Sequence, residues 1–350
     1  MRLDVLNRRE TMLGLTTAMG LKAFAPGPDR RLRYPSPSAE TKALYGFLWG
    51  IYGVHTLTGQ QEQNFTSAGP GQELAYLKRV TGRQPALLGF DYIHPDENAA
   101  VNERAIAWAR SGGIVSICWH WGAPGGPPGY EASKADFDLE AGLTPGTPEN
   151  KAMLRDMDVV ADLLKGLRDA GVPVLWRPLH EFSGQWFWWG RHSAEGFKAL
   201  WLLMQDRFTQ LHRLDNLIWV LGWAGQNVDP AFYPGRAHVD IVGADIYVED
   251  DGNLAPMFAQ VKAIVGNSVP ICLHENGPVP DPSRLGPDAD WLWFMTWHTE
   301  WLESDTLNPP DRLRRAYASD RYLTHDQLPI DFLTRRRLEA PFYPSARRNS

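Results

Sequence analysis

Cysteine is scarce in this sequence, which holds only Cys118 and Cys272, far apart and each inside an apolar run. Two such residues form neither a disulfide framework nor the paired spacing of a zinc site. We therefore expect both to be small buried side chains, with one disulfide as the less favoured alternative. An excess of basic residues is also missing, because the formal net charge is −6, and this argues against nucleic-acid binding. No Gly-x-Gly-x-x-Gly turn or Walker lysine supports a nucleotide cofactor.

Long hydrophobic runs are missing too, and this bears on the N-terminal region. The apolar stretch 12–21 is too short to span a bilayer, and it lies between Arg8-Arg9 and Ala23-Phe24-Ala25. Paired arginines, a short apolar segment and a small-x-small site resemble an export signal of the twin-arginine type. We therefore predict a signal peptide over residues 1–25 and export to the periplasm or the medium. A basic tail is the alternative.

Tryptophan, by contrast, is abundant, with 15 residues, and many of them stand beside Gly, Pro, His or Glu rather than in apolar runs. Rings in such surroundings suggest a lined groove, and core filling is the alternative. The Gly- and Pro-rich loop 122–147 is too long for a plain connector, and long loops of this kind are often functional.

Short apolar runs alternate with longer helical patterns from about Tyr34 onward. Eight runs are predicted as strands: 43–54, 85–92, 113–120, 172–181, 217–223, 239–247, 269–275 and 293–301. Helices are predicted between them, at 99–112, 150–171 and 194–212 among others. Eight buried strands that alternate with helices indicate a parallel α/β fold, and their number favours a single (β/α)8 TIM barrel. We assign residues 41–335 to this barrel, 26–40 to a Pro-rich linker and 336–350 to a C-terminal tail.

Polar residues stand at the carboxyl ends of the predicted strands, where the reacting groups of such a barrel lie. These residues are His120 on the third strand, Arg177, His180 and Glu181 on the fourth, Asp245 and Tyr247 on the sixth, and His274 and Glu275 on the seventh. Glu181 and Glu275 come from opposite sides of the barrel mouth. Glycoside cleavage requires such a pair, because one carboxyl protonates the leaving oxygen while the other attacks or activates water.

The neighbours of the two glutamates suggest different roles. Rings at residues 186–188 would remove water from Glu181, raise its pKa and keep it protonated as the acid/base. Hydrogen bonds from Arg177 or Tyr247 would keep Glu275 ionised as the nucleophile. For Arg177, a role in the charge balance of the barrel core is the alternative.

The stretch WRPLHEFSGQWFWWG (176–190) closely resembles the acid/base motif of glycoside hydrolase family 26, whose members are mostly endo-β-1,4-mannanases on an eight-stranded barrel. Five further motifs resemble that family in order: TLTGQQE, GGIVSICWHW, VDIVGADIY, HENGPVPDP and WFMTWHTEW. Together with a closing segment similar to the family's, the resemblance runs from about Tyr45 to Pro329. It implies a retaining mechanism, for which the two carboxyls should lie roughly 5–5.5 Å apart.

The resemblance also implies roles for the surrounding residues. His180 would hydrogen-bond near the nucleophile or the sugar, and Tyr247 would hold the nucleophile. Trp186 and Trp297 would stack on sugar faces. Three further residues would line the glycone subsites: His120, Trp121 and Asp245. With Arg177, these are the predicted substrate-binding residues.

The expected function is that of an exported, monomeric endo-β-1,4-mannanase acting on a mannan-type polysaccharide, without membrane contact in its mature form. His274 and His298 depart from the family pattern and leave the exact polysaccharide open, so a β-1,3-xylanase and a mixed-linkage glucanase remain alternatives. A non-catalytic carbohydrate-binding barrel and a metal-dependent deacetylase are alternatives of other classes. No His-Glu-x-x-His helix is present, so we expect no metal and no cofactor.

Overall fold

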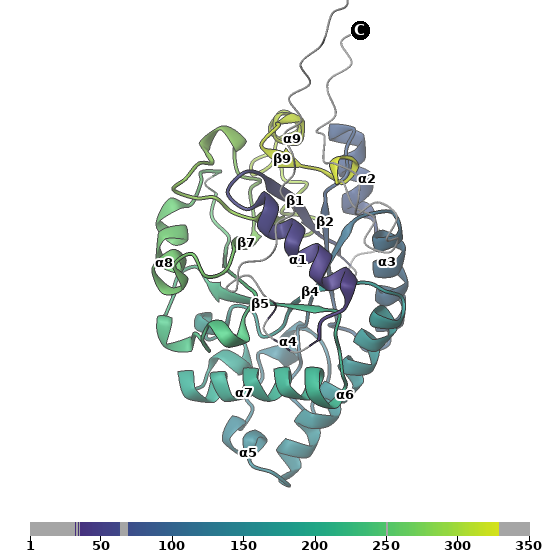
Figure 1. Ribbon diagram of the computed structural model, residues 1–350, viewed down its shortest axis with the longest axis vertical. Helices are drawn as coiled ribbons and strands as arrows, with labels where there is room; N and C mark the ends of the chain where they lie inside the picture. The colour runs from purple at the N-terminus through teal and green to yellow at the C-terminus, as the bar shows by residue number, and fades with distance from the viewer. Residues whose placement is uncertain (1–31, 33, 35, 64–68, 250, 329–350) are drawn as a thin grey trace, which may run out of the picture.

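The computed structural model in Figure 1 describes residues 32, 34, 36–63, 69–249 and 251–328. The predicted signal peptide and C-terminal tail lie outside these residues, as does much of the predicted linker. Within the described ranges, no helix has the length and hydropathy needed to cross a membrane.

Eight parallel strands close into a barrel, which confirms the predicted fold. Each strand pairs with the next along the chain, and β1 closes the ring by pairing with both β2 and β8. The strands are β1 (Thr56–Gln61), β2 (Leu87–Asp91), β3 (Ile114–Cys118), β4 (Val174–Arg177), β5 (Leu217–Ala224), β6 (Ile241–Ile246), β7 (Ile271–Asn276) and β8 (Trp293–Thr296). A short strand β9 (Tyr322–Leu323) pairs with the start of β1.

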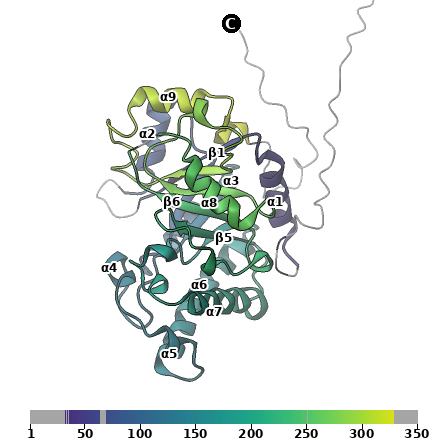
Figure 2. The ribbon, with the colours of Figure 1, turned by 90° about the vertical axis from the view of Figure 1, so that its left-hand side faces the viewer.

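Helices lie around the outside of the strands (Figures 1 and 2). They are α2 (Gln72–Thr81), α3 (Asn98–Arg110), α4 (Tyr130–Ser133), α5 (Leu139–Leu143), α6 (Pro148–Asp169), α7 (Ala194–Asp206), α8 (Ala255–Val265) and α9 (Pro310–Ala318). The three helices named from the sequence are confirmed as α3, α6 and α7. In α6, Thr147 caps the first turn by accepting a hydrogen bond from the Asn150 N–H, and Pro148 occupies the first position. Gly171, with φ +74°, follows its last turn.

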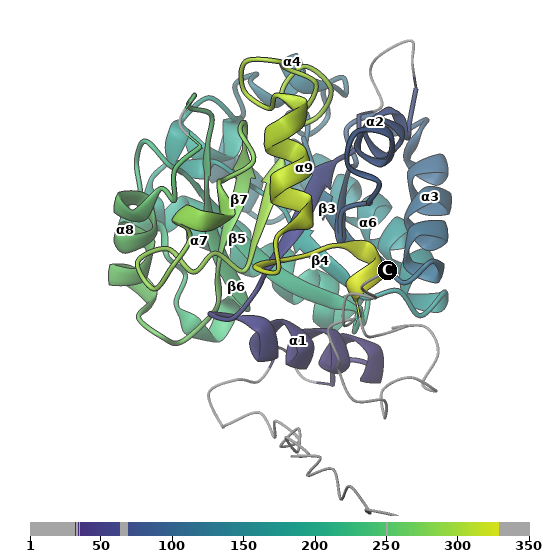
Figure 3. The ribbon, with the colours of Figure 1, turned by 90° about the horizontal axis from the view of Figure 1, so that it is seen from above.

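The predicted strand at 43–54 is wrong, because these residues belong mainly to helix α1 (Ala39–Ile51). Its buried stripe recurs every three or four positions: Leu44, Tyr45, Leu48 and Ile51. This stripe packs on the amino ends of the strands, against Leu57 and Leu87 among others. Figure 3 shows α1 beneath the barrel, at the end opposite α4. The helix thus closes the amino end of the barrel, and the more polar segment TLTGQQ forms the first strand.

Candidate active site

A cavity of about 590 Å³ lies at the carboxyl ends of the strands. This size is typical of a small-molecule or oligosaccharide site. Seven of the predicted site residues line it: His120, His180, Glu181, Trp186, Tyr247, Glu275 and Trp297. Six residues that were not predicted as site residues complete its wall: Ile93, Tyr130, Phe187, Gln226, His298 and Trp301. Both glutamates therefore face one aromatic-lined space.

The loop after β4 has an unusual backbone. Leu179, Glu181 and Gln185 all adopt the left-handed conformation, with φ of 54°, 52° and 65°. Bulky residues rarely adopt it, and such conformations concentrate at functional sites. β4 ends at Arg177, so His180 and Glu181 follow the strand, and both side chains reach the cavity. The alternation of side chains along a regular strand therefore does not apply to these two neighbours.

One hydrogen bond anchors this loop to β5, and a second holds two parts of the loop together. The Glu181 N–H donates to Gly222 O (2.8 Å), and Trp189 Nε1 donates to His180 O (2.8 Å). Trp188 and Trp189 are fully buried. They act as supports below the cavity, whereas Trp186 and Phe187 form part of its wall.

Glu275 accepts the two hydrogen bonds expected from the sequence. Arg177 Nη1 donates to Glu275 Oε1 (3.0 Å), and the Tyr247 hydroxyl donates to Glu275 Oε2 (2.8 Å). Arg177 is fully buried, and its guanidinium keeps its positive charge. Both donors stabilise a negative charge on Glu275, as a nucleophile requires.

Glu181 has a different environment. Burial raises its pKa to about 8, and the negative charge of Glu275 acts in the same direction. A hydrogen bond from Trp186 Nε1 to Glu181 Oε2 (2.7 Å) acts in the opposite direction, because it favours the ionised form. Glu181 is therefore protonated at neutral pH, while Glu275 lies beside a cation. This difference is what a general acid and a nucleophile need.

A bulge in β7 explains why two consecutive residues, His274 and Glu275, both point toward the barrel interior. Relative to β6 and β8, strand β7 carries one extra residue between Leu273 and Asn276. In a regular strand neighbouring side chains point to opposite faces, and a bulge changes this alternation. Arg177 Nη1 consequently contacts both the His274 ring (3.0 Å) and Glu275.

Three predicted substrate-binding residues lie behind the cavity wall rather than on it. Asp245 is 1% exposed, and its Oδ1 lies 2.5 Å from His274 Nδ1. Trp121 is 2% exposed, stacks on Trp119 with ring centroids 4.2 Å apart, and donates to Asp156. Arg177 contacts Glu275 from inside the barrel. In this arrangement these residues position other side chains and do not themselves face the cavity.

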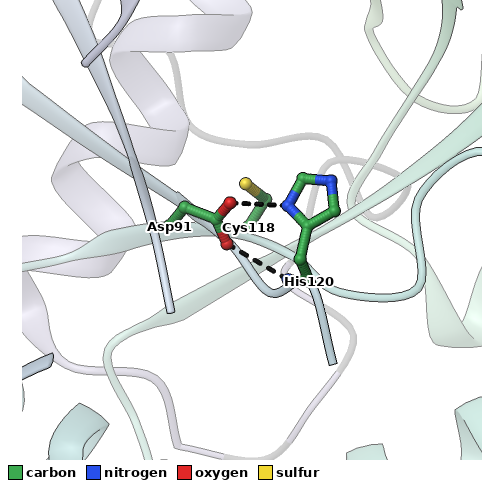
Figure 4. A group of neighbouring side chains, drawn as sticks. All are labelled: Asp91, Cys118 and His120. Atoms are coloured by element: carbon green, nitrogen blue, oxygen red, sulfur yellow. Dashed lines mark hydrogen bonds and ion pairs between the residues drawn. The ribbon is translucent and has the colours of Figure 1, made fainter. Parts of the chain in front are cut away.

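Asp91, at the end of β2, is a site residue that the sequence did not single out. Its carboxylate accepts two hydrogen bonds from His120, one from the ring Nδ1 (2.5 Å) and one from the backbone N–H (3.1 Å) (Figure 4). Burial opposes a charge on His120, but the negative charge of Asp91 and this hydrogen bond raise the pKa of His120. The other ring nitrogen of His120 lies 3.2 Å from His180 Nε2, so one of the two rings donates a hydrogen bond to the other.

Two groups in the described residues bring three potential metal ligands together: Asp91, Cys118 and His120, and Asp245, His274 and Glu275. In each group the carboxylate oxygen and the histidine nitrogen are 2.5 Å apart. Oxygen and nitrogen ligands of a tetrahedral Zn²⁺ stand about 3.4 Å apart, given metal–ligand bonds of about 2.0–2.1 Å. These contacts therefore have the geometry of hydrogen bonds rather than of a metal centre.

Some signals of the unpredicted residues are visible in the sequence. Trp301 is the last residue of the WFMTWHTEW motif, and Tyr130 belongs to the long loop 122–147. Tyr130 begins α4 and reaches the cavity. The expectation that this loop is functional thus has a structural basis. Gln226 and Ile93 follow β5 and β2 without any distinctive sequence pattern.

Residues 34–319 match the family model for glycosyl hydrolase family 26. The chain is 36% identical over 336 residues to a mannan endo-1,4-beta-mannosidase of Thermothelomyces thermophilus, covering 90% of this chain and 67% of the relative. It is 32% identical to mannan endo-1,4-beta-mannosidase B of Piromyces sp, covering 93% of this chain and 61% of that relative. The chain thus spans about two thirds of the first relative's length and less of the second's.

Solved structures show the same similarity. The beta-(1,4)-mannanase of Podospora anserina is 34% identical, with a TM-score of 0.79 over 87% of this chain and 70% of that chain. A beta-mannanase from a symbiotic protist of the termite Reticulitermes speratus, complexed with gluco-manno-oligosaccharide, is 33% identical. Its TM-score is 0.80 over 86% of this chain and 98% of that chain. This chain therefore belongs to glycosyl hydrolase family 26.

Proposed function

We propose that this protein hydrolyses β-1,4-mannosidic bonds within mannan-type polysaccharides, with retention of anomeric configuration. One observation carries the proposal: Glu181 and Glu275 line one cavity in opposite electrostatic environments. The names of the relatives, which are mannan endo-1,4-beta-mannosidases, support the choice of polysaccharide.

In the first step, the Glu275 carboxylate attacks the anomeric carbon while Glu181 donates its proton to the departing glycosidic oxygen. The bond to the leaving sugar breaks as a bond to Glu275 Oε forms, giving a glycosyl-enzyme. In the second step, Glu181 takes a proton from water, whose oxygen displaces Glu275. Glu275 is uncharged in the intermediate, so its repulsion, which adds to burial in raising the pKa of Glu181, is lost. Glu181 can then act as a base.

The aromatic wall gives the site its affinity for sugar. Trp186, Trp297 and Trp301 offer ring faces to the apolar faces of pyranose rings, and ring stacking excludes water from the scissile bond. Tyr130 extends the wall at the exposed rim and is 47% accessible. An open rim of this kind suits a chain cut internally, as the proposed endo action requires.

A hydrolysis panel tests the proposal. Mannan, galactomannan, β-1,3-xylan and mixed-linkage glucan are incubated with the protein, and products are separated by length. We expect oligosaccharides from the two mannans, with β-anomers formed first when products are followed by NMR. Cleavage of xylan or glucan alone would show that the proposed polysaccharide is wrong. If α-anomers form first, the reaction inverts the anomeric configuration and the retaining mechanism is contradicted. Binding without cleavage would indicate a non-catalytic barrel.

Export, predicted from residues 1–25, is part of the proposal. The pair Arg8-Arg9 and the segment Ala23-Phe24-Ala25 support it. Fractionation of the producing cells tests export, because the mature protein should be found outside the cytoplasm, and replacing both arginines by lysine should retain the full-length chain inside.

A further inference from the structure

One arch after β8, defined as residues 297–301, supplies a large part of the cavity wall. Trp297, His298 and Trp301 all line the cavity. Trp301 packs on Tyr247, with ring centroids 4.8 Å apart, and Tyr247 in turn donates to Glu275. The shape of the arch therefore determines where sugar rings meet the nucleophile.

The middle of this arch has an unfavourable backbone conformation. Thr299 has φ +40°, in the left-handed region, and it is β-branched. For a β-branched residue this conformation is a genuine outlier, because its side chain collides with the backbone. Such a conformation persists only when surrounding contacts hold it in place. The contacts of Thr299 therefore matter for the whole arch.

Two hydrogen bonds of Thr299 end on the carboxylate of Glu73 on α2, and the Thr299 carbonyl accepts a third from the Glu303 N–H (2.8 Å). Glu73 Oε1 accepts hydrogen bonds from both the backbone N–H and the hydroxyl of Thr299, each at 3.0 Å. Glu73 Oε2 accepts from the Gln63 N–H at 3.4 Å. Glu73 is fully buried, although it is a charged residue 226 positions away in the sequence and does not line the cavity.

We propose that Glu73 is a positioning residue for substrate binding, which holds Thr299 in its left-handed conformation and so fixes Trp297, His298 and Trp301 on the cavity wall. The inference rests on the proposed function only in that sugar binds against this wall. Burying an acid costs free energy unless its oxygens accept hydrogen bonds. Oε1 of Glu73 accepts from Thr299 on the arch, and Oε2 accepts from Gln63, so the carboxylate joins these two segments.

The test compares Glu73→Gln with the matched variant Glu62→Gln. Glu62 is another nearly buried carboxyl, but it pairs with Arg104 (2.7 Å) and does not contact the arch. With the oligosaccharide that the wild type cleaves fastest, Glu73→Gln should raise KM about tenfold, because an amide accepts at only one atom and lacks the charge. Since the arch binds sugar without touching the reacting atoms, kcat should change less than about threefold.

A double-mutant cycle with Thr299→Gly separates positioning from a general loss of stability. Glycine adopts φ +40° without strain and has no hydroxyl. In this variant the left-handed conformation therefore no longer depends on the hydrogen bonds to Glu73. In the Thr299→Gly background, the effect of Glu73→Gln on KM should fall below about twofold. An equal effect in both backgrounds would overturn the proposal, as would a lowered melting temperature with unchanged KM.

Hydrogen exchange tests the inference without any substrate, so its outcome is independent of the proposed function. The amides of residues 297–303 should exchange at least about tenfold faster in Glu73→Gln than in the wild type. They should be unchanged in Glu62→Gln. Unchanged protection of this segment in Glu73→Gln would overturn the inference even if the protein proves to be a mannanase.

Discussion

Replacing Glu275 by alanine should lower the release of reducing sugar from mannan by roughly 10⁴–10⁶-fold, the order of magnitude seen when a covalent nucleophile is removed. The variant has no carboxylate to form the glycosyl-enzyme. The aromatic wall and Glu181 remain, so oligosaccharide binding measured by calorimetry should persist. Retained hydrolysis would contradict the assignment of Glu275.

This substitution also leaves the buried Arg177 without its ion-pair partner, and loss of a partner inside the barrel can itself destabilise the fold. Glu275→Gln is therefore measured in parallel, because its amide oxygen can still accept from Arg177 or Tyr247. Glu195→Ala on the exposed side of α7 serves as the surface control and should keep full activity. Circular dichroism should give the same folded spectrum for all three variants.

Added azide distinguishes the two glutamates. In Glu275→Ala an azide ion can occupy the space of the missing carboxylate and attack the anomeric carbon directly, giving an α-glycosyl azide. In a Glu181 variant the azide displaces Glu275 from the glycosyl-enzyme, giving a β-glycosyl azide. A β product from Glu275→Ala would exchange the two assigned roles.

Replacing Glu181 by glutamine should lower kcat on mannan by about 10²–10⁴-fold, the usual contribution of a general acid. Measured as kcat/KM, which reports only the formation of the glycosyl-enzyme, the loss should be much smaller on an aryl glycoside whose phenolate leaves without protonation, because that step then needs no acid. An equal loss on both substrates would indicate a structural defect rather than a missing proton donor.

The pH dependence follows from the raised pKa of Glu181, about 8. Glu181 must carry its proton to act as an acid, so kcat/KM of the wild type should fall as the pH rises through about 8. Glu181→Gln should lack this alkaline limb. Trp186→Phe removes a hydrogen bond that favours the carboxylate form, so the pKa of Glu181 should rise and the limb should move to higher pH.

Trp49→Phe, on α1 at the opposite end of the barrel, is the matched control and should leave the limb in place. A profile in Trp186→Phe that shifts to lower pH would contradict the role of this hydrogen bond.

Much of the fold was predictable because its signals are local. The apolar stripe of α6 and the runs of β2 to β8 repeat at the periods of a helix and of buried strands. The first strand was missed because β1 carries buried polar residues such as Thr58 and Gln60, while α1 is apolar on more than one side. The polar residues of β1 are buried only because the closed barrel surrounds them, and the sequence of this segment alone does not indicate their burial.

The pair Glu181 and Glu275 was also evident from the sequence, since each stands at the end of an apolar run and has aromatic or cationic neighbours nearby. Asp91 and Glu73 were not evident from the sequence. A single acidic residue forms no repeating pattern, and the partner of each lies far away in the chain. His120 is 29 residues from Asp91, and Thr299 is 226 residues from Glu73.

The sequence by itself determined the barrel, the two carboxyls and the family resemblance, because periodicity and motif spacing are properties of neighbouring residues. Only the tertiary structure decided which of the predicted binding residues face the cavity. The β7 bulge and the left-handed turn at Leu179 and Glu181 set those directions. Both depend on strands and loops that meet only after folding, so no local pattern specifies them.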